Sequence, residues 1–311
     1  NLKMKKIFLG AFSIFLLNSC SKEESNTTEN LTPNPTTEKI YFDGFNSSIG
    51  TNGLKWNELY TIELNGNNQS KLSNISSNGT IEKYAENPII ENSKIYFVSD
   101  KDGGNGEIYK MNLDGTNIIR LTDNSGNSFS NLKSFSNATK LIAEKEKTVS
   151  LEKVGEIYVM NIDGTSQTKL TDYPTDGNCR NPSVNTQNNK ILFACKINST
   201  DYQIYSMNID GSNKQILTTN NTLYKTNPSF SIDGNKIVFE GKVASTGNKH
   251  TEIFIMNSNG TNIVQLTNYS SNGTLNTVTG DPIFSNDGSK IYYVSDETGV
   301  SQIYSMNIEG T

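Results

Sequence analysis

An eighteen-residue motif that recurs at a fixed period constrains this chain more than any other feature. Its copies include "GEIYKMNLDGTNIIRLTD", "GEIYVMNIDGTSQTKLTD" and "TEIFIMNSNGTNIVQLTN". The glycine of the central turn falls at residues 66, 115, 164, 211, 260 and 310, so successive copies lie 49, 49, 47, 49 and 50 residues apart. Six copies at a period near 49 predict a repeat architecture in which each unit packs against the next.

Each unit is predicted to contain four strands. In the fifth copy these are residues 227–231, 236–241, 252–257 and 262–268. Asp-Gly or Asn-Gly between two β-prone runs predicts a tight hairpin, because the turn requires positive φ. The second and third strands are nearly continuous apolar runs, which indicates burial on both faces, whereas the fourth alternates and suits an outer edge. The first strand often carries a proline such as Pro228, which favours an inner edge because proline cannot donate to a ladder.

These units predict an all-β chain folded as a six-bladed β-propeller of four-stranded antiparallel blades over residues 39–311. The alternative, a pair of β-sandwiches, is disfavoured by the regular period. The first copy begins at "KIYF" without a predicted first strand, and the last copy stops at "IYSMNIEGT" without a fourth. We therefore expect an incomplete C-terminal blade and a chain that is a fragment of a longer one.

The repeat "NPSFSIDGNKIVFEG…EIFIMNSNGTNIVQLTN" resembles that of the TolB-type propeller family, which is related to WD-repeat-like propellers. The resemblance covers residues 39–311. The family's Ser-Pro-Asp-Gly turn appears here as Ser231-Ile232-Asp233-Gly234, without the proline. The resemblance implies a propeller that binds protein partners through its channel mouth. It carries over no binding residue, because the matched positions belong to the scaffold.

The amino terminus is predicted to direct export. Residues 1–19 contain lysines followed by an apolar core that is too short to span a bilayer comfortably, which is typical of a signal peptide. The sequence "LNSC" at 17–20 resembles a bacterial lipobox, in which Cys20 is lipidated and becomes the new amino terminus. The alternative is an ordinary secretory signal with an incidental cysteine.

Residues 20–38 are predicted to form a flexible tether, because they are rich in Ser, Thr, Asn and Glu. Within it, Lys22, Glu23 and Glu24 resemble the signal that sends lipoproteins to the surface of some Gram-negative bacteria; the alternative is that they are only solvated tether. We expect an outer-membrane lipoprotein whose lipid anchor attaches it to the membrane. Exposure at the cell surface is the expected orientation, and a periplasm-facing one is the alternative.

Catalytic chemistry finds little support. The chain has no Gly-x-Ser-x-Gly elbow and a single histidine, His250. The sequence therefore predicts no catalytic residue, no metal site and no cofactor. The aspartate of the repeated turn, for example Asp163, is expected to serve hairpin geometry rather than bind calcium. The net charge of −5 and the lack of a basic cluster argue against a nucleic-acid partner.

Cys179 and Cys195 form a candidate disulfide, which export would permit. Hairpin pairing of the first and second strands sets Asn181 roughly opposite Cys195, so a bond to Cys179 needs a small shift. The alternative is one buried thiol and one loop thiol.

Recognition is expected on the loops between blades and between second and third strands, which share one face of a propeller and vary most here. Trp56 and Tyr173 are the candidate ligand-face residues. The favoured function is a non-catalytic binding propeller, tethered by lipid to the bacterial outer membrane, that recognises an envelope protein segment or a glycan. The alternative is the propeller portion of a larger exported peptidase of the prolyl-oligopeptidase type.

Overall fold

The computed structural model describes residues 14–16, 39–45, 57–63, 67–72, 84–123, 126–135, 138–185, 187, 189–197, 201–219, 224–242, 251–268, 279–297 and 302–311. All regular secondary structure within these ranges is β-strand, so they contain no helix that could cross a membrane.

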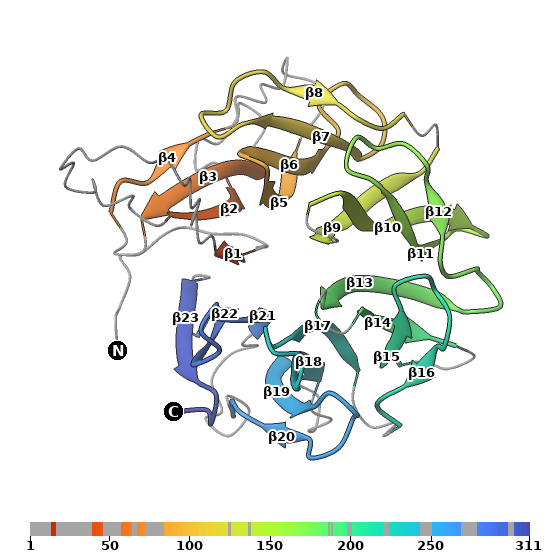
Figure 1. Ribbon diagram of the computed structural model, residues 1–311, viewed down its shortest axis with the longest axis vertical. Helices are drawn as coiled ribbons and strands as arrows, with labels where there is room; N and C mark the ends of the chain where they lie inside the picture. Colours follow the sequence, from red (N-terminus) through yellow and green to blue (C-terminus); the bar gives the residue numbers. More distant parts are fainter. Residues whose placement is uncertain are drawn as a thin grey trace, which may run out of the picture.

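The strands form six sheets arranged as blades around a central axis (Figure 1). Blade 1 contains β1 (Ile14–Leu16), β2 (Lys39–Phe45), β3 (Asn57–Glu63) and β4 (Ser70–Lys71). Blade 2 contains β5 (Ala85–Glu91), β6 (Lys94–Ser99), β7 (Glu107–Asn112) and β8 (Ile119–Arg120). Blade 3 contains β9 (Ser128–Phe135), β10 (Lys140–Val149), β11 (Glu152–Asn161) and β12 (Thr168–Lys169). Blade 4 contains β13 (Asn178–Asn185), β14 (Lys190–Lys196), β15 (Gln203–Asn208) and β16 (Gln215–Ile216). Blade 5 contains β17 (Lys225–Phe230), β18 (Lys236–Lys242), β19 (Thr251–Asn257) and β20 (Val264–Gln265). Blade 6 contains β21 (Thr279–Phe284), β22 (Lys290–Ser295) and β23 (Gln302–Asn307).

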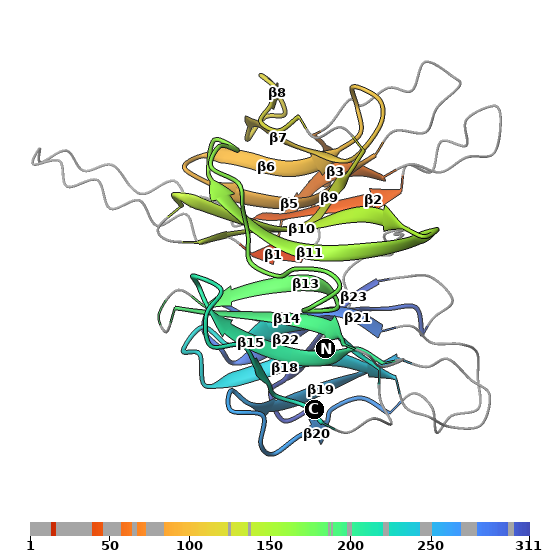
Figure 2. The same cartoon turned by 90° about the vertical axis from the view of Figure 1, so that its right-hand side faces the viewer.

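Sequential strands are antiparallel neighbours in each blade, and Figure 2 shows them running side by side. The last blade has three strands in the described residues. The predicted all-β, six-bladed β-propeller with an incomplete C-terminal blade is therefore confirmed.

The first blade differs from the prediction. Its innermost strand is β1, and Ile14–Leu16 pairs with Ile40–Phe42 of β2. These three residues lie within the predicted signal peptide, for which no place in a blade is expected. An extended apolar segment can occupy this place because β2 otherwise exposes an unpaired edge. The pairing lasts only while residues 14–16 stay attached, so the signal-peptide prediction implies that the mature blade loses β1.

The repeated turn is held by an aspartate and a glycine. Asp163 Oδ1 accepts hydrogen bonds from the backbone N–H of Thr165 at 3.0 Å and from its hydroxyl at 2.6 Å. Gly164 has φ 84°, and a Cβ there would lie 2.4 Å from the carbonyl oxygen of Leu121 in the preceding blade. The same glycine-to-leucine approach recurs at Gly115 with Leu72 and at Gly260 with Leu217. The turn thus requires glycine for its backbone conformation and for contact between blades.

The Leu-Thr ending of the motif closes the outer edge of each blade. In blade 5, the N–H of Leu266 donates to the carbonyl of Ile253 at 2.8 Å, and the N–H of Ile253 donates to Thr267 Oγ1 at 2.9 Å. The predicted fourth strand 262–268 is therefore only two residues long, because a threonine hydroxyl takes over from the backbone as acceptor. The same threonine bond is made by Thr122, Thr171 and Thr218.

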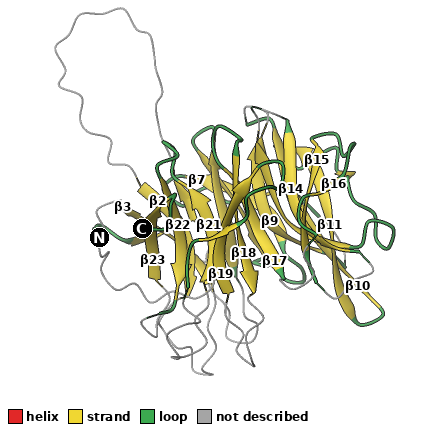
Figure 3. Cartoon of the chain, turned by 90° about the horizontal axis from the view of Figure 1, so that it is seen from below, coloured by secondary structure: helices red, strands yellow, loops and turns green. Residues whose placement is uncertain are grey.

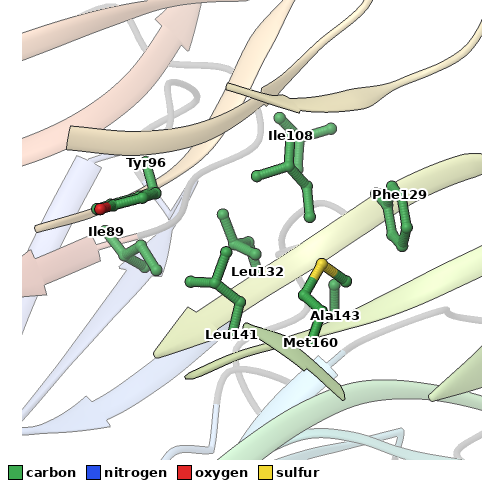
Figure 4. Packing of buried hydrophobic residues seen from close by; sticks show 9 residues of the cluster. Ile89, Tyr96, Ile108, Phe129, Leu132, Leu141, Ala143 and Met160 are labelled. Atoms are coloured by element: carbon green, nitrogen blue, oxygen red, sulfur yellow. The ribbon is translucent and has the colours of Figure 1, made fainter. Parts of the chain in front are cut away.

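Apolar clusters fill the spaces between consecutive blades. The cluster between blades 2 and 3 is shown in Figure 4 and consists of Ile89, Tyr96, Val98, Ile108, Phe129, Leu132, Leu141, Ala143 and Met160. Equivalent clusters join blades 1 and 2, 3 and 4, 4 and 5, and 5 and 6. Each large side chain buried here contributes roughly 1.5–3 kcal/mol. Side chains of the second and third strands face both neighbouring blades, which explains their nearly continuous apolar sequence.

Candidate functional site

The innermost strands carry a bulge at the same place in blades 2 to 6. Their pairing with the second strand shifts register there, at a residue with left-handed backbone. These residues are Asn87, Asn131, Asn181, Asn227 and Asp281, with φ between 49 and 53°. Asn and Asp tolerate this conformation better than other non-glycine residues. Proline follows in four of the five copies, so the inner-strand prolines sit at the bulge rather than at the strand start.

At one position of the second strand, a buried carboxylate alternates with an apolar residue from one blade to the next. The position four residues after the lysine that begins each strand is Asp43, Glu144 and Glu240 in blades 1, 3 and 5. These side chains are 2, 2 and 9% exposed. The corresponding residues of blades 2, 4 and 6 are Val98, Ala194 and Val294. The polar interior of the propeller therefore repeats every two blades, although the sequence repeats every blade.

Each of these carboxylates accepts the backbone N–H of the left-handed residue in the next blade. A bulge takes this N–H out of the ladder, and a buried donor left unpaired would cost about 1–3 kcal/mol. The donor-to-acceptor pairs are Asn87 to Asp43 at 3.3 Å, Asn181 to Glu144 at 3.2 Å and Asp281 to Glu240 at 2.6 Å. The carboxylates thus join blade 1 to 2, blade 3 to 4 and blade 5 to 6.

The inner strands enclose a hollow with a narrow and a wide part. The narrow part, about 60 Å³, is lined by four of the five left-handed residues and by their neighbours: Asn131, Lys133, Asn181, Pro182, Ser183, Asn227, Pro228, Ser229, Asp281, Pro282 and Ile283. The wide part, about 510 Å³, is lined by Asp43, Tyr84, Glu86, Asn87, Ser128, Phe129, Ser130, Asn131, Glu146, Lys153, Asn181, Asn227 and Asp281.

The wide part opens where the inner strands begin, beside the long β10–β11 hairpin that reaches beyond its neighbours in Figure 3. We call this the loop end of the propeller and the opposite end, with the Asp-Gly turns, the turn end.

Carboxyl groups at the loop end have raised pKa values. Burial, followed by the charge of Glu146, raises the pKa of Glu86 to about 7. Burial and the neighbouring Glu240 raise the pKa of Asp281 to about 8. Burial lowers the pKa of Lys133 to about 8, although the charge of Asp281 acts in the opposite direction. The carboxyl groups lie in a poorly solvated space where their negative charges repel one another, so an arriving cation would favour their ionised form.

Positive charge gathers over blades 4 and 5 at the same end. The guanidinium carbon of Arg180 lies 4.6 Å from the ring centroid of Tyr202, and Lys196 Nζ lies 5.8 Å from it. Lys242 Nζ lies 4.6 Å from the ring centroid of Tyr224, and the two rings meet edge to face at 5.1 Å. We call these five residues the cationic cluster. Cations over aromatic faces gain about 0.5–2 kcal/mol without needing a carboxylate.

The predicted site residues fall in different places. Tyr173 is half-buried; its N–H donates to Glu156 Oε1 at 2.9 Å, and Lys147 Nζ lies 5.9 Å from its ring centroid. It does not line the described hollow. The residues Cys20, Lys22, Glu23, Glu24, Trp56 and His250 lie outside the described residues.

The two candidate cysteines are joined. Cys179 and Cys195 form a disulfide, with their Cα atoms 4.1 Å apart. Cys179 lies directly opposite Cys195 in the ladder, whereas hairpin counting set Asn181 there. The counting differed from the observed register by two residues, and the bulge accounts for one of them, because Asn181 and Pro182 together lie opposite the single residue Phe193. The bond ties the innermost strand of blade 4 to its neighbour, one residue before Arg180.

The sequence predicts recognition on the loop face or at the channel mouth, but the buried acids of the interior were not predicted. A signal was present: "YFDG", "IAEK" and "VFEG" each carry an acid at the same position of an otherwise apolar strand in alternate copies. Over the described ranges, no three His, Cys, Asp or Glu side chains are grouped to hold a metal ion. The chemistry that the described site offers is hydrogen bonding and charge recognition.

No protein-family model matches the sequence, and no curated protein sequence matches it. Solved structures do match its fold. TolB from Acinetobacter baumannii superimposes with a TM-score of 0.63 at 18% identity, over 82% of this chain and 58% of that one. A putative TolB from Agrobacterium tumefaciens superimposes with a TM-score of 0.57 at 18% identity, over 87% of each chain. This chain has the fold of the TolB-type propellers. It spans less than two thirds of the A. baumannii protein.

The TolB-type fold also occurs in an enzyme. A puromycin-hydrolyzing peptidase from Mycobacterium tuberculosis superimposes with a TM-score of 0.63 at 9% identity, over 96% of this chain and 43% of that one. Because the same propeller accompanies different activities, the fold alone does not assign one. The function of this propeller has to be argued from the side chains at its loop end.

Proposed function

We propose that this protein is a non-catalytic binding propeller that recognises a segment of an envelope protein at the loop end of its channel. The observation that carries the proposal is the wide hollow of about 510 Å³, which opens at the loop end and is lined, beside the repeated left-handed residues, by side chains that differ from blade to blade, such as Glu86, Ser130 and Lys153. The repeated residues satisfy backbone groups and pack blades together, so they are committed to the scaffold. A rigid scaffold with a variable polar opening suits recognition.

Attachment to the outer membrane through a lipid on Cys20, with the protein facing the cell surface, is part of the proposal. The lipobox-like "LNSC" at 17–20 and the following Lys22, Glu23 and Glu24 support it. Cells that express the wild type and the variant Cys20→Ala are labelled with a palmitate analogue. We expect label on the wild type only. Equal labelling of both would remove the anchor, and protection of intact cells' protein from added protease would favour the periplasm-facing orientation.

Blocking the hollow tests the binding proposal. Ser130 lines the wide part, and Ser130→Trp would place a large ring in it. The matched control is Ile232→Trp, at an exposed position (52%) on the first turn of blade 5 at the turn end. Tagged proteins are crosslinked in cells and the captured envelope proteins are compared.

We expect the wild type and Ile232→Trp to capture the same protein, and Ser130→Trp to lose it. Equal capture by all three would place recognition elsewhere. Loss of capture after digestion of surface glycans would point to a glycan ligand.

A second candidate function rests on the likeness to the peptidase from M. tuberculosis, of which this chain would correspond to 43%. On that reading the propeller is one part of an exported enzyme. The reading frame beyond Thr311 tests it: an α/β-hydrolase segment with a nucleophile elbow would support the peptidase, and a stop codon within about one hairpin would remove it.

A further inference from the structure

One position at the loop end carries a different charge in each alternate blade. It is the residue just before the left-handed residue of the inner strand, opposite the apolar residue of the second strand. In blades 2, 4 and 6 this residue is Glu86, Arg180 and Gly280. We call these three positions the stations of the loop end. The surrounding framework is repeated, whereas this position is not. Because the residues at this position differ while the framework around them repeats, a ligand can bind in one orientation more tightly than in the others.

The station in blade 4 suits a carboxylate. Arg180 forms none of the salt bridges found among the described residues, although burial raises the pKa of the Glu144 carboxyl and the charge of Arg180 acts to lower it. Its Nη2 donates a long hydrogen bond of 3.5 Å to Asn178 Oδ1, and its side chain also hydrogen-bonds Tyr224. The ring of Tyr202 holds the guanidinium in place, and Lys242 adds a second charge nearby. A guanidinium held in place in this way binds a carboxylate strongly and often in a bidentate way.

The station in blade 2 has the opposite chemistry. Glu86 lines the wide hollow together with Tyr84, Glu146 and Lys153, and Lys153 Nζ lies 3.7 Å from Glu146 Oε2. The negative charges of Glu146 and Asp100 both oppose ionisation of Glu86. A cationic side chain entering here would relieve that repulsion.

The station in blade 6 holds no side chain. A Cβ on Gly280 would lie 3.1 Å from Glu240 Oε1, so glycine here makes room for the buried carboxyl group of blade 5. The three stations are spaced by two blades around the channel, so a ligand that touches the charged pair must extend across the opening.

We propose that the loop end binds an extended peptide segment of mixed charge, which places a carboxylate on Arg180 and a cation on Glu86. This inference rests on the proposed function and names the chemistry of the partner segment. An extended strand covers about 3.3 Å per residue, so a segment of several residues is needed to reach both stations. Opposite charges at its two ends fix the direction in which it lies.

The experiment measures binding of synthetic nonapeptides that carry an uncharged fluorophore and blocked ends, by fluorescence anisotropy at low salt. The probes have a Gly/Ser/Tyr centre flanked by Glu and Lys, by two Glu, by two Lys or by two Gln. We expect the Glu/Lys probe to bind at least tenfold more tightly than the other three. We expect Glu86→Gln and Arg180→Gln each to weaken its binding about tenfold.

Exchange of the two charges provides the sharper test. Glu86→Arg and Arg180→Glu alone each place like charges at both stations and should abolish binding. The double exchange should restore it, because the probe can bind in the reverse direction. Arg120→Gln is the matched control: the chain's only other arginine pairs with Glu107 and Asp123 on an outer edge, so this variant should bind like the wild type. Circular dichroism establishes that each variant is folded.

Equal binding of the four probes, or a double exchange that does not recover binding, would overturn the inference. Its failure can be told apart from failure of the proposed function. If Ser130→Trp abolishes capture of an envelope protein while Glu86→Gln and Arg180→Gln leave it unchanged, the binding site stands and the charge pattern falls. If no probe binds and Ser130→Trp captures normally, both fall.

Discussion

The two ends of the same blades treat acidic side chains in opposite ways. At the turn end, the hydroxyl and N–H of Thr165 hold the pKa of Asp163 below its usual value, and Thr116 does the same for Asp114. At the loop end, burial raises the pKa of Glu86 and Glu144 to about 7. The turn end is repeated and its donors are all supplied locally. The residues of the loop end differ between blades, and their charges are only partly neutralised by neighbouring groups. A bound ligand can therefore supply the remaining neutralising charge.

We expect the largest loss of stability from a substitution of the turn glycine, which tests whether backbone conformation and close packing determine the structure of the turn end. Gly164→Ala would force a side chain into a left-handed conformation and against the carbonyl of Leu121, 2.4 Å away. We expect a loss of about 4 kcal/mol in the free energy of unfolding, from backbone strain and overpacking together. Gly126→Ala is the control, since its φ is also 84° but no atom lies within 4 Å. Urea unfolding measures both, and equal losses would show that the contact between blades contributes nothing.

The disulfide tests how far the loop end depends on a covalent link. Cys179 and Cys195 are 16 residues apart in sequence, and a loop of this size contributes about 3 kcal/mol in the chain-entropy account. We expect the double variant Cys179→Ala, Cys195→Ala to unfold at correspondingly lower urea. The wild type in reductant should behave like the double variant. Stability that does not respond to either change would mean that the bond is absent in solution.

The network between blades tests whether the buried acids belong to the scaffold. Glu144→Ala would leave the N–H of Asn181 and the amide of Asn131 without their acceptor, at a cost of about 2 kcal/mol. Glu144→Gln keeps an acceptor oxygen and should cost less. The two variants are compared by urea unfolding at pH 7. A larger loss in Glu144→Gln than in Glu144→Ala would contradict this role.

The pH dependence of stability is expected to differ between the acids of the loop end and those of the turn end. The pKa of Glu144 is raised from 4.5 to about 7, so between these values the folded state keeps a proton that the unfolded state has released. Stability therefore falls as the pH rises through this window. We expect the urea midpoint of the wild type to decrease from pH 5 to pH 8 and that of Glu144→Gln to decrease less. Parallel curves for the two proteins would show that Glu144 does not titrate in this range.

The smallest effect is expected at Asp163. Its lowered pKa means that its contribution to stability is present above the ordinary pKa of aspartate and is lost as the pH falls below it. The side chain is fully exposed, so water replaces most of what Asp163→Ala removes. We expect the smallest midpoint shift of all these variants at pH 7 and none at pH 2.5. A shift as large as that of Glu144→Ala would erase the difference between the two ends.

Much of the fold could be predicted because its causes are local. The Asp-Gly turn around Gly164 and the apolar runs on either side determine hairpins from residues adjacent in sequence. The bulges were not predicted, since an Asn before Pro182 is compatible with a strand start as well as with a left-handed residue inside a strand. The bond between Cys179 and Cys195 was a candidate, and the bulge accounts for one of the two residues by which their predicted register differed from the observed one.

The sequence by itself determined the number of blades, the order of strands within them and the places of the turns. Tertiary structure decided which side chains meet at the loop end. Asn87 and Asp43 are 44 residues apart and Asn227 and Asp281 are 54 apart, and only the packing of neighbouring blades brings each pair within hydrogen-bonding distance. Hairpin rules act over a few residues, whereas burial and charge at the channel depend on neighbours contributed by other blades.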